Sequence, residues 1–386
     1  PLTRNGFVDI NKLESVGDTL TTRDGLDFAG WFTDASCEIP FYDSKYTRIT
    51  SNTVIYAGWN TLLTSYDFVH TESPGNGLQS CTFTNTTGTA DTTMWIVKDA
   101  FKTSGLVPLT ETADRYTVGL LRGMYEVTMT VTDVNGEKKV LSKTEKVTGT
   151  ITDAVTWNDY SSAATQHTIT YTLDVEEYIK YAKMNRVRDF RIANIANHAT
   201  PGADVVQNIA NELKALPYWS LPSTTGQDRA NLIASFVNEG LSYNGGSDGD
   251  SRYYRIQGVH MSPEQVEYYR YPAEALYDRK LFNMLGDCDC HAIITAAIAK
   301  ACGFDSAVLV MTNTSEKEGH AIAGIKGDFI KPPEQSIPTL NGKASFNEEK
   351  GYYSCETFRK GWKLWVGNVD ADYIGNGWTW NAFPVK

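Results

Sequence analysis

The stretch that decides the fold of the carboxy-terminal half reads Leu285-Gly286-Asp287-Cys288-Asp289-Cys290-His291-Ala292. Helix signals surround the apolar run that begins here: Gly286 permits a sharp turn, Asp287 suits an N-cap, and Gly303 stands where glycine often follows a helix end. The residues between are mostly small or branched and apolar, namely Ala292, Ile293, Ile294, Ala296, Ala297, Ile298, Ala299 and Ala301. A helix that is apolar almost all round is a buried one, so the stretch predicts a central helix that begins near Cys288.

Cys288 lies in the first turn of this predicted helix, where free backbone N–H groups and the helix dipole favour a thiolate. The flanking carboxylates of Asp287 and Asp289 work against the thiolate, so a base is needed to hold the proton. His320 and Glu356 follow in two later strand patterns, at 320–325 and 352–357. A histidine suits this task, because an imidazole can hold the proton while the thiolate attacks a carbonyl carbon.

The alternation of side chains along the strand supports Glu356 as the acid of this site. Alternate side chains of a strand share a face, so Glu356 points with Ser354 and Tyr352, while Cys355 points the other way into the core. Asp328 is the alternative acid. Residues 331–345, which contain three prolines, are expected to form a loop inserted between two paired strands.

The whole pattern resembles the transglutaminase-like superfamily, whose catalytic domain has a papain-type fold. The matching residues are Gly286-Asp287-Cys288-Asp289, Ala292, Gly303-Phe304, Gly319-His320-Ala321 and the strand that carries Glu356. The resemblance implies that Cys288 is the nucleophile, His320 the base and Glu356 the acid that orients the base. It also implies that the backbone N–H of Cys288 is one oxyanion donor and suggests Tyr243 as the second. Two departures are the Glu in place of the commoner Asp and its position 36 residues beyond His320.

Cys290 has three interpretations: a resolving thiol, the nucleophile itself, or a core residue. It lies about 200° around the helix from Cys288, so both cannot face one cleft, and core packing is favoured.

Cys290 and His291 together suggest a metal site, but no second Cys/His pair has zinc spacing. Ser247–Ser251 hints at calcium but lacks a later bidentate Glu, so an acidic turn is expected. No metal and no other cofactor is therefore predicted, and His70, His167, His198 and His260 are expected to be structural or exposed.

Residues 151–386 are predicted to form one α+β domain. A strand is expected at Thr168–Leu173 and helical spacing follows over 174–186. The ranges Ala203–Leu216 and Gln227–Leu241 have the periodicity of amphipathic helices. Because these helices precede a run of strands, the domain is of the α+β class.

Residues 1–60 predict a short all-β unit. Asp24–Thr33 and Ile49–Trp59 resemble an internalin-type B repeat, with Phe28, Trp31, Tyr56 and Trp59 at that family's aromatic positions. Such a small unit has a marginal core, to which large aromatic side chains contribute much of the buried area. The resemblance implies a β-grasp-like spacer of secreted and cell-surface proteins.

Residues 61–150 predict a β-sandwich. Tyr125, Val127, Met129 and Val131 alternate with polar residues, Asn135-Gly136 is a hairpin turn, and a strand is expected over 139–147. This hairpin resembles that of PKD-type domains, and Trp95 is the candidate for their core tryptophan. The resemblance again implies a spacer module.

Composition excludes some functions. The chain has 386 residues and a net charge of −11, which argues against nucleic acid as a partner. No apolar run is long enough to span a bilayer, and residues 1–30 lack a signal-peptide pattern. Six cysteines are too few for a disulfide scaffold.

Together these patterns predict a multidomain secreted or cell-surface protein, with two small all-β modules followed by an α+β transglutaminase-like cysteine enzyme. It is expected to act on amide bonds through a Cys288 thioester, as a peptidase or amidase. The expected substrate is a protein or a peptide-containing wall polymer. Two alternatives are a cross-linking transglutaminase, in which an amine resolves the thioester, and a catalytically inactive adhesin or binding protein.

Overall fold

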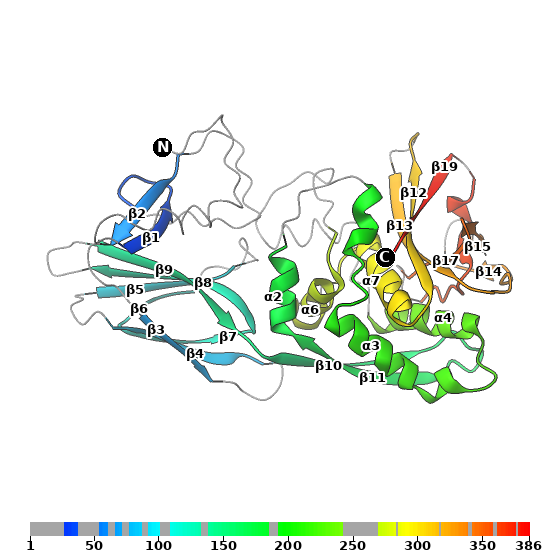
Figure 1. The fold of residues 1–386 in the computed structure, drawn as a ribbon, viewed down its shortest axis with the longest axis horizontal. Helices are drawn as coiled ribbons and strands as arrows, with labels where there is room; N and C mark the ends of the chain where they lie inside the picture. The colour runs from blue at the N-terminus through cyan, green and yellow to red at the C-terminus, as the bar shows by residue number, and fades with distance from the viewer. Residues whose placement is uncertain are drawn as a thin grey trace. The chain divides into compact units, whose positions relative to one another are not determined.

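The structure is a computed structural model that describes residues 27–37, 54–60, 66–71, 77–86, 92–100, 109–132, 138–184, 192–241, 269–282, 285–315, 318–338, 342–357, 361–375 and 377–386. These residues form a mixed α+β structure with β-rich sheets toward the amino terminus, a central helical segment and a curled antiparallel sheet toward the carboxyl terminus (Figure 1). The chain divides into two compact units, with the change at Gly149 and Thr150. The division of the first unit into modules 1–60 and 61–150 stays a prediction.

The described part of the first unit consists of antiparallel strands. They are β1 (Asp27–Phe32), β2 (Tyr56–Asn60), β3 (Tyr66–Thr71), β4 (Gln79–Asn85), β5 (Thr92–Asp99), β6 (Leu109–Thr112), β7 (Arg115–Leu120), β8 (Gly123–Thr132) and β9 (Lys138–Val147). They form a β1-β2 pair, a three-stranded β3-β4-β7 sheet and a four-stranded β6-β5-β8-β9 sheet.

The alternation predicted for β8 is confirmed. Tyr125, Val127, Met129 and Val131 are buried and pack in one cluster with Trp95. The Trp95 ring is fully buried, and its Nε1 donates to a backbone carbonyl oxygen at 2.8 Å. Thr128 departs from the pattern, since it is buried as well, and its hydroxyl is satisfied by a serine hydroxyl of β9 at 2.9 Å. The Asn135-Gly136 turn lies outside the described residues.

The aromatic residues of β1 and β2 differ in how far the structure buries them. Strands β1 and β2 pair with Phe28 opposite Trp59. Tyr56, which is predicted to contribute buried area, is 37% exposed. Among the residues of this segment whose burial the structure describes, Phe32 is a buried aromatic side chain, and it packs against Val140 of β9.

The second unit contains the helices. They are α2 (Val175–Ala182), α3 (Asp204–Ala215), α4 (Gly226–Ser235), α6 (Pro272–Phe282) and α7 (Cys288–Ala301), the 3₁₀ segments η2 (Ile192–His198), η3 (Pro217–Ser220) and η6 (Ala371–Tyr373), and the π-helical η4 (Phe236–Gly240). The strands are β10 (Thr150–Asn158), β11 (Gln166–Asp174), β12 (Asp305–Asn313), β13 (Glu318–Lys326), β14 (Gln335–Ser336), β15 (Lys343–Phe346), β16 (Glu348–Glu349), β17 (Tyr352–Cys355), β18 (Asn368–Asp370) and β19 (Trp378–Pro384).

Helix α7 is the predicted central helix. It starts at Cys288 after Gly286, whose φ is +117°, and it ends before Gly303, whose φ is +100°. At its end the N–H of Gly303 and that of Phe304 donate back to the last turn at 2.9 and 3.0 Å, which is a Schellman arrangement. Asp287 is the N-cap residue, but its side chain makes none of the hydrogen bonds expected of a cap. Nearly all of α7 is buried, and it packs against β12 and β13 (Figure 1).

The sheet beneath α7 has the strand order β16-β17-β13-β12-β19, all antiparallel. Strands β13 and β17 are paired, so the predicted pairing across the inserted segment is confirmed. The segment 331–345 is more ordered than the plain loop that its prolines predicted. It contributes β14 and β15, which form a small sheet with β18.

A buried ionic cluster joins the β10-β11 hairpin to α6. The Asp153 carboxylate accepts from Tyr171 Oη and Lys280 Nζ, both at 2.8 Å, and pairs with Arg279. Arg279 also donates to the backbone oxygen of Leu241, just past η4. Burial alone would raise the pKa of Asp153, but the hydrogen bonds from Lys280 and Tyr171 and the Arg279 charge outweigh it and lower the pKa below 3.8.

We expect Asp153→Asn to lower the free energy of unfolding at pH 7 by roughly 3 kcal/mol, because two cations lose their buried partner. Since the folded-state pKa is lowered, this stabilisation is present at neutral pH and disappears as the pH falls below 3.8. Urea unfolding at pH 7 and at pH 3 measures the difference in the free energy of unfolding between wild type and variant. An equal stability difference at the two pH values would contradict the assignment.

Candidate active site

His320 and Glu356 come together on one face of the second unit's main sheet. His320 is near the start of β13, and Glu356 directly follows β17. The His320 Nε2 and Glu356 Oε2 atoms are 2.8 Å apart, and the two side chains are only 6% and 4% exposed. The register pairs Gly324 with Ser354, so Glu356 shares the face of His320, as strand parity predicts. Cys355 points the other way and is buried in the core.

The imidazole of His320 is held on a second side by an aromatic ring. Tyr373, in η6, stacks on it with a centroid distance of 4.9 Å and an interplanar angle of 24°. The carboxylate and the phenol ring together define both the position and the plane of the imidazole. Because Nε2 is used by Glu356, Nδ1 is the nitrogen that can exchange a proton with a thiol.

Asp328, the alternative acid, is placed elsewhere. It lies in an exposed turn two residues beyond the end of β13, whereas His320 is the third residue of that strand. An extended strand rises about 3.3 Å per residue, which puts the two residues at opposite ends of β13. The carboxylate that His320 meets is therefore that of Glu356.

Cys288 is the first residue of α7 and is partly exposed. The first turns of this helix lie near the segment that follows β17, since Thr295 contacts Thr357, and the Thr357 backbone and the Glu356 charge both influence the pKa of His291. Burial lowers the pKa of His291 to about 4, although the Thr357 backbone and the carboxylates of Asp287 and Glu356 work in the opposite direction. His291 is thus neutral at pH 7 and is not the charged partner of a thiolate.

Two buried hydroxyl groups tie α7 to the chain around Glu356. Thr295 Oγ1 donates to the His291 carbonyl oxygen at 2.8 Å and lies 2.9 Å from Thr357 Oγ1. Because the Thr295 proton is already used, Thr357 is the donor in the second bond. The helix that starts with Cys288 is therefore held in register with the residue after Glu356.

Cys290 is fully buried, in agreement with the core-packing interpretation. A side chain on Gly286 would place its Cβ 2.5 Å from Cys290 Sγ, so glycine is required there for space as well as for its positive φ. Ligand atoms of Asp287, Asp289 and Cys290 lie within 4.8 Å of one another. They mix hard oxygen with soft sulfur and come from one helix turn, and we assign no metal to them.

Of the remaining residues named from the sequence, the structure describes the two upstream cysteines but not the segment that contains Tyr243. Tyr243 and the Ser247–Ser251 turn lie outside the described residues. All six cysteines are free thiols, so Cys37 and Cys81 form no disulfide.

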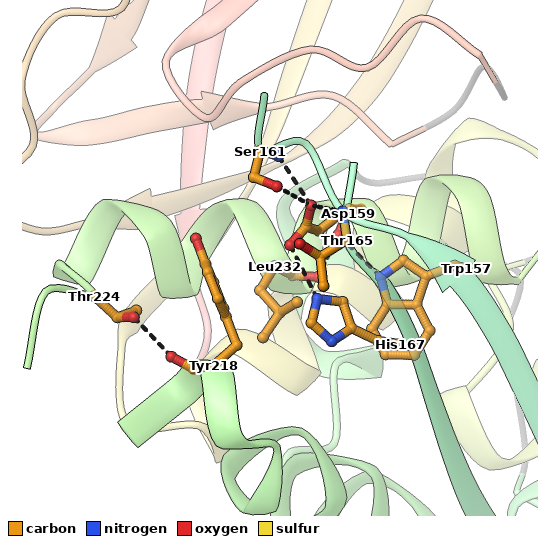
Figure 2. A network of polar contacts seen from close by, with 9 residues as sticks. Trp157, Asp159, Ser161, Thr165, His167, Tyr218, Thr224 and Leu232 are labelled. Atoms are coloured by element: carbon orange, nitrogen blue, oxygen red, sulfur yellow. Dashed lines mark hydrogen bonds and ion pairs between the residues drawn. The ribbon is translucent and has the colours of Figure 1, made fainter. Parts of the chain in front are cut away.

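His167 is structural, as expected, and belongs to a buried polar network that the sequence did not predict. Its Nε2 lies 2.9 Å from Asp159 Oδ2, while Asp159 Oδ1 accepts from the backbone N–H groups of Ser161 and Thr165 and from the Ser161 hydroxyl. Figure 2 shows the carboxylate between Ser161 and His167. In a serine hydrolase the histidine stands between serine and acid, whereas here the acid is central. This network therefore stabilises the β10-β11 loop and does not activate the serine.

Two further buried residues of the second unit, Tyr160 and Asn238, were not predicted from the sequence. Tyr160 is buried, and its pKa is raised by burial and by the charges of Glu239, Cys355 and Glu356. Its hydroxyl accepts from Asn238 Nδ2 at 2.9 Å. Asn238 belongs to η4, and π-helical turns are frequent at functional sites. The only available signal was the position of Asn238 near the end of a predicted helix, which does not distinguish a π turn from an ordinary one.

Glu239, the residue after Asn238, binds the chain a few residues beyond Glu356. Glu239 Oε1 accepts from the Gly361 N–H at 2.8 Å. With Thr357 held by Thr295, the described residues on both sides of 358–360 are attached to helical elements. The position of Glu356 is thus determined by α7 and η4 as well as by β17.

Comparison with protein-family models found no match to this chain, and comparison with curated proteins found none. The resemblances to transglutaminase-like, B-repeat and PKD-type sequences therefore stay predictions. Among the described residues, no helix is both long and apolar enough to cross a membrane.

Proposed function

We propose that this chain is a cysteine enzyme of the transglutaminase-like type with a papain-type catalytic domain, which acts on amide bonds through a thioester on Cys288. The single observation that carries the proposal is the buried His320–Glu356 hydrogen bond of 2.8 Å. A buried carboxylate on one imidazole nitrogen stabilises the imidazolium and fixes the tautomer, as general base catalysis requires. The position of Cys288 at the start of a buried helix supports its role as nucleophile.

In the proposed reaction, the Cys288 thiol gives its proton to His320 Nδ1, and the thiolate attacks the carbonyl carbon of an amide. The backbone N–H of Cys288 donates to the developing oxyanion. His320 then protonates the leaving nitrogen, and the C–N bond breaks to leave a thioester. Water attacks the thioester while His320 takes its proton, and the carboxylic acid departs as the thiol is restored.

Hydrolysis is the proposed outcome because water needs no binding site of its own, whereas cross-linking needs a site that selects an amine. Incubation with a glutamine-bearing peptide and a primary amine tests the two outcomes. We expect the peptide to gain the mass of a deamidated product, since ammonia is released and water adds. Accumulation of the amine adduct as the main product would instead support a cross-linking enzyme.

The two all-β modules proposed for residues 1–60 and 61–150 fit a secreted or cell-surface protein, and a protein or peptide-containing wall polymer is the proposed substrate. A catalytically inactive adhesin is the alternative from another class. The close contact between His320 and Glu356 favours the enzyme, because a site that serves only for binding gains nothing from an acid that orients a buried base.

A further inference from the structure

The second unit contains a cavity of ≈ 450 Å³ whose lining residues have no role in the proposed reaction. Its walls come from the β10-β11 loop, from α4 and from the segment around residues 330–333. Flat apolar surfaces line part of it, supplied by Tyr218, Trp365 and Pro332, with Leu232 beside them. In Figure 2 Tyr218 and Leu232 stand next to the Asp159 network. Pockets of this size bind small organic ligands, with aromatic walls giving contact area and a few polar groups giving orientation.

One acceptor and one donor face the cavity side by side. Asp228 and Asn231 are three residues apart on α4 and therefore neighbours on one face of the helix. Asp228 uses only Oδ2 in its capping box, and Oδ1 accepts nothing from the described residues. The oxygen of Asn231 accepts from the Val366 N–H at 2.8 Å, and its NH₂ group donates to none of the described residues. A pair of adjacent hydroxyl groups, one donating to Asp228 and one accepting from Asn231, satisfies both.

The charges around the cavity favour a neutral ligand. The Asp159 carboxylate is fully engaged by its own loop and by His167. Among the described residues of the cavity wall, the remaining charged groups are Asp228 and Lys331, one of each sign. A cationic ligand would leave the Asn231 donor unused and would meet Lys331, whereas an anionic ligand would meet Asp228.

We infer that this cavity is a saccharide site for one or two sugar rings. A sugar ring has an apolar C–H face, which packs on the Tyr218 and Trp365 rings, and an edge of alternating donors and acceptors, which matches Asp228, Asn231 and Ser161. Tyr160 lines the same cavity, whereas Cys288, His320 and Glu356 are not among its lining residues. This inference goes beyond the proposed function, because binding in the cavity requires no thiol chemistry.

NMR titration of the full chain with N,N′-diacetylchitobiose, cellobiose and maltose tests the inference. We expect at least one disaccharide to bind with a Kd of about 1 mM or tighter. Preference for the acetylated sugar would indicate an amino-sugar polymer as the source, and preference for cellobiose or maltose a glucose polymer. Tyr218→Ala and Trp365→Ala are expected to weaken binding at least about tenfold, since each removes a stacking surface.

Trp219→Ala is the matched control, because Trp219 neighbours Tyr218 on η3 but does not line the cavity. It should leave the affinity unchanged. Cys288→Ala should bind the sugar as wild type does, so the failure of catalysis and the failure of this site are distinguishable. Absence of binding by all three sugars, equal binding by the folded Tyr218 and Trp365 variants, or selective binding of a lysine or arginine amide would overturn the inference.

Discussion

Cys288→Ala should reduce the deamidation of a glutamine-bearing peptide by about 10⁴-fold or more, to the level of the uncatalysed reaction. Alanine has no nucleophile, so neither the thioester nor any later step can form. The fold should be retained, because Cys288 is partly exposed at the start of α7 and its loss leaves little cavity. Ammonia release measures the activity, and the unfolding temperature of the variant checks that it is folded.

Cys290→Ala is the matched control for this experiment. It removes a thiol two residues away on the same helix, but from a fully buried position. We expect a loss of about 1 kcal/mol of stability and nearly full activity in the folded protein. The opposite result, with Cys288→Ala active and Cys290→Ala inactive but folded, would make Cys290 the nucleophile and remove the basis of the proposed site.

Glu356→Gln should lower kcat by about 10² to 10⁴-fold while leaving KM little changed. Glutamine has nearly the same shape as glutamate, so the side chain still packs beneath His320. It lacks the negative charge that stabilises the imidazolium when the thiol proton is transferred. Steady-state kinetics on the glutamine-bearing peptide, with the pH profile of kcat, measures the effect.

Asp328→Asn provides the control for the acid, since this carboxylate is exposed and lies beyond the far end of β13. It should leave both kcat and KM unchanged. Equal losses of kcat in the two variants, or a loss confined to Asp328→Asn, would show that the acid had been assigned wrongly.

Local sequence signals predict much of the second unit. The apolar run after Cys288, with Gly286 and Gly303 on either side, predicts α7 and both of its ends, because glycine alone adopts the backbone angles found there without strain. The strand patterns at 320–325 and 352–357 likewise predict β13 and β17, and side-chain alternation along β17 predicts the face on which Glu356 meets His320. These features depend on residues close together in the chain.

The features that sequence reasoning missed depend on tertiary packing. Asp159 and His167 approach each other only because the β10-β11 hairpin folds back between them, and nothing in the intervening residues marks the pair. The π-helical turn that brings Asn238 to Tyr160 has the same hydrophobic pattern as an ordinary helix end. Strands β14 and β15 are short, and β15 has β18, further along the chain, as its second partner, so the prolines near them indicated only a loop.

We propose to measure the rate at which iodoacetamide alkylates each cysteine near pH 7. These rates test whether His320 activates the thiol of Cys288. Burial raises the pKa of Cys81 to about 11 and that of Cys302 to about 12, and it raises the pKa of Cys355 further still, so these thiols should react slowly. We expect Cys288 to be modified at least about 100-fold faster than any of them, and His320→Ala to remove most of this difference. Slow modification of Cys288 at the same rate as Cys302, unaffected by His320→Ala, would contradict the activation of Cys288 by His320.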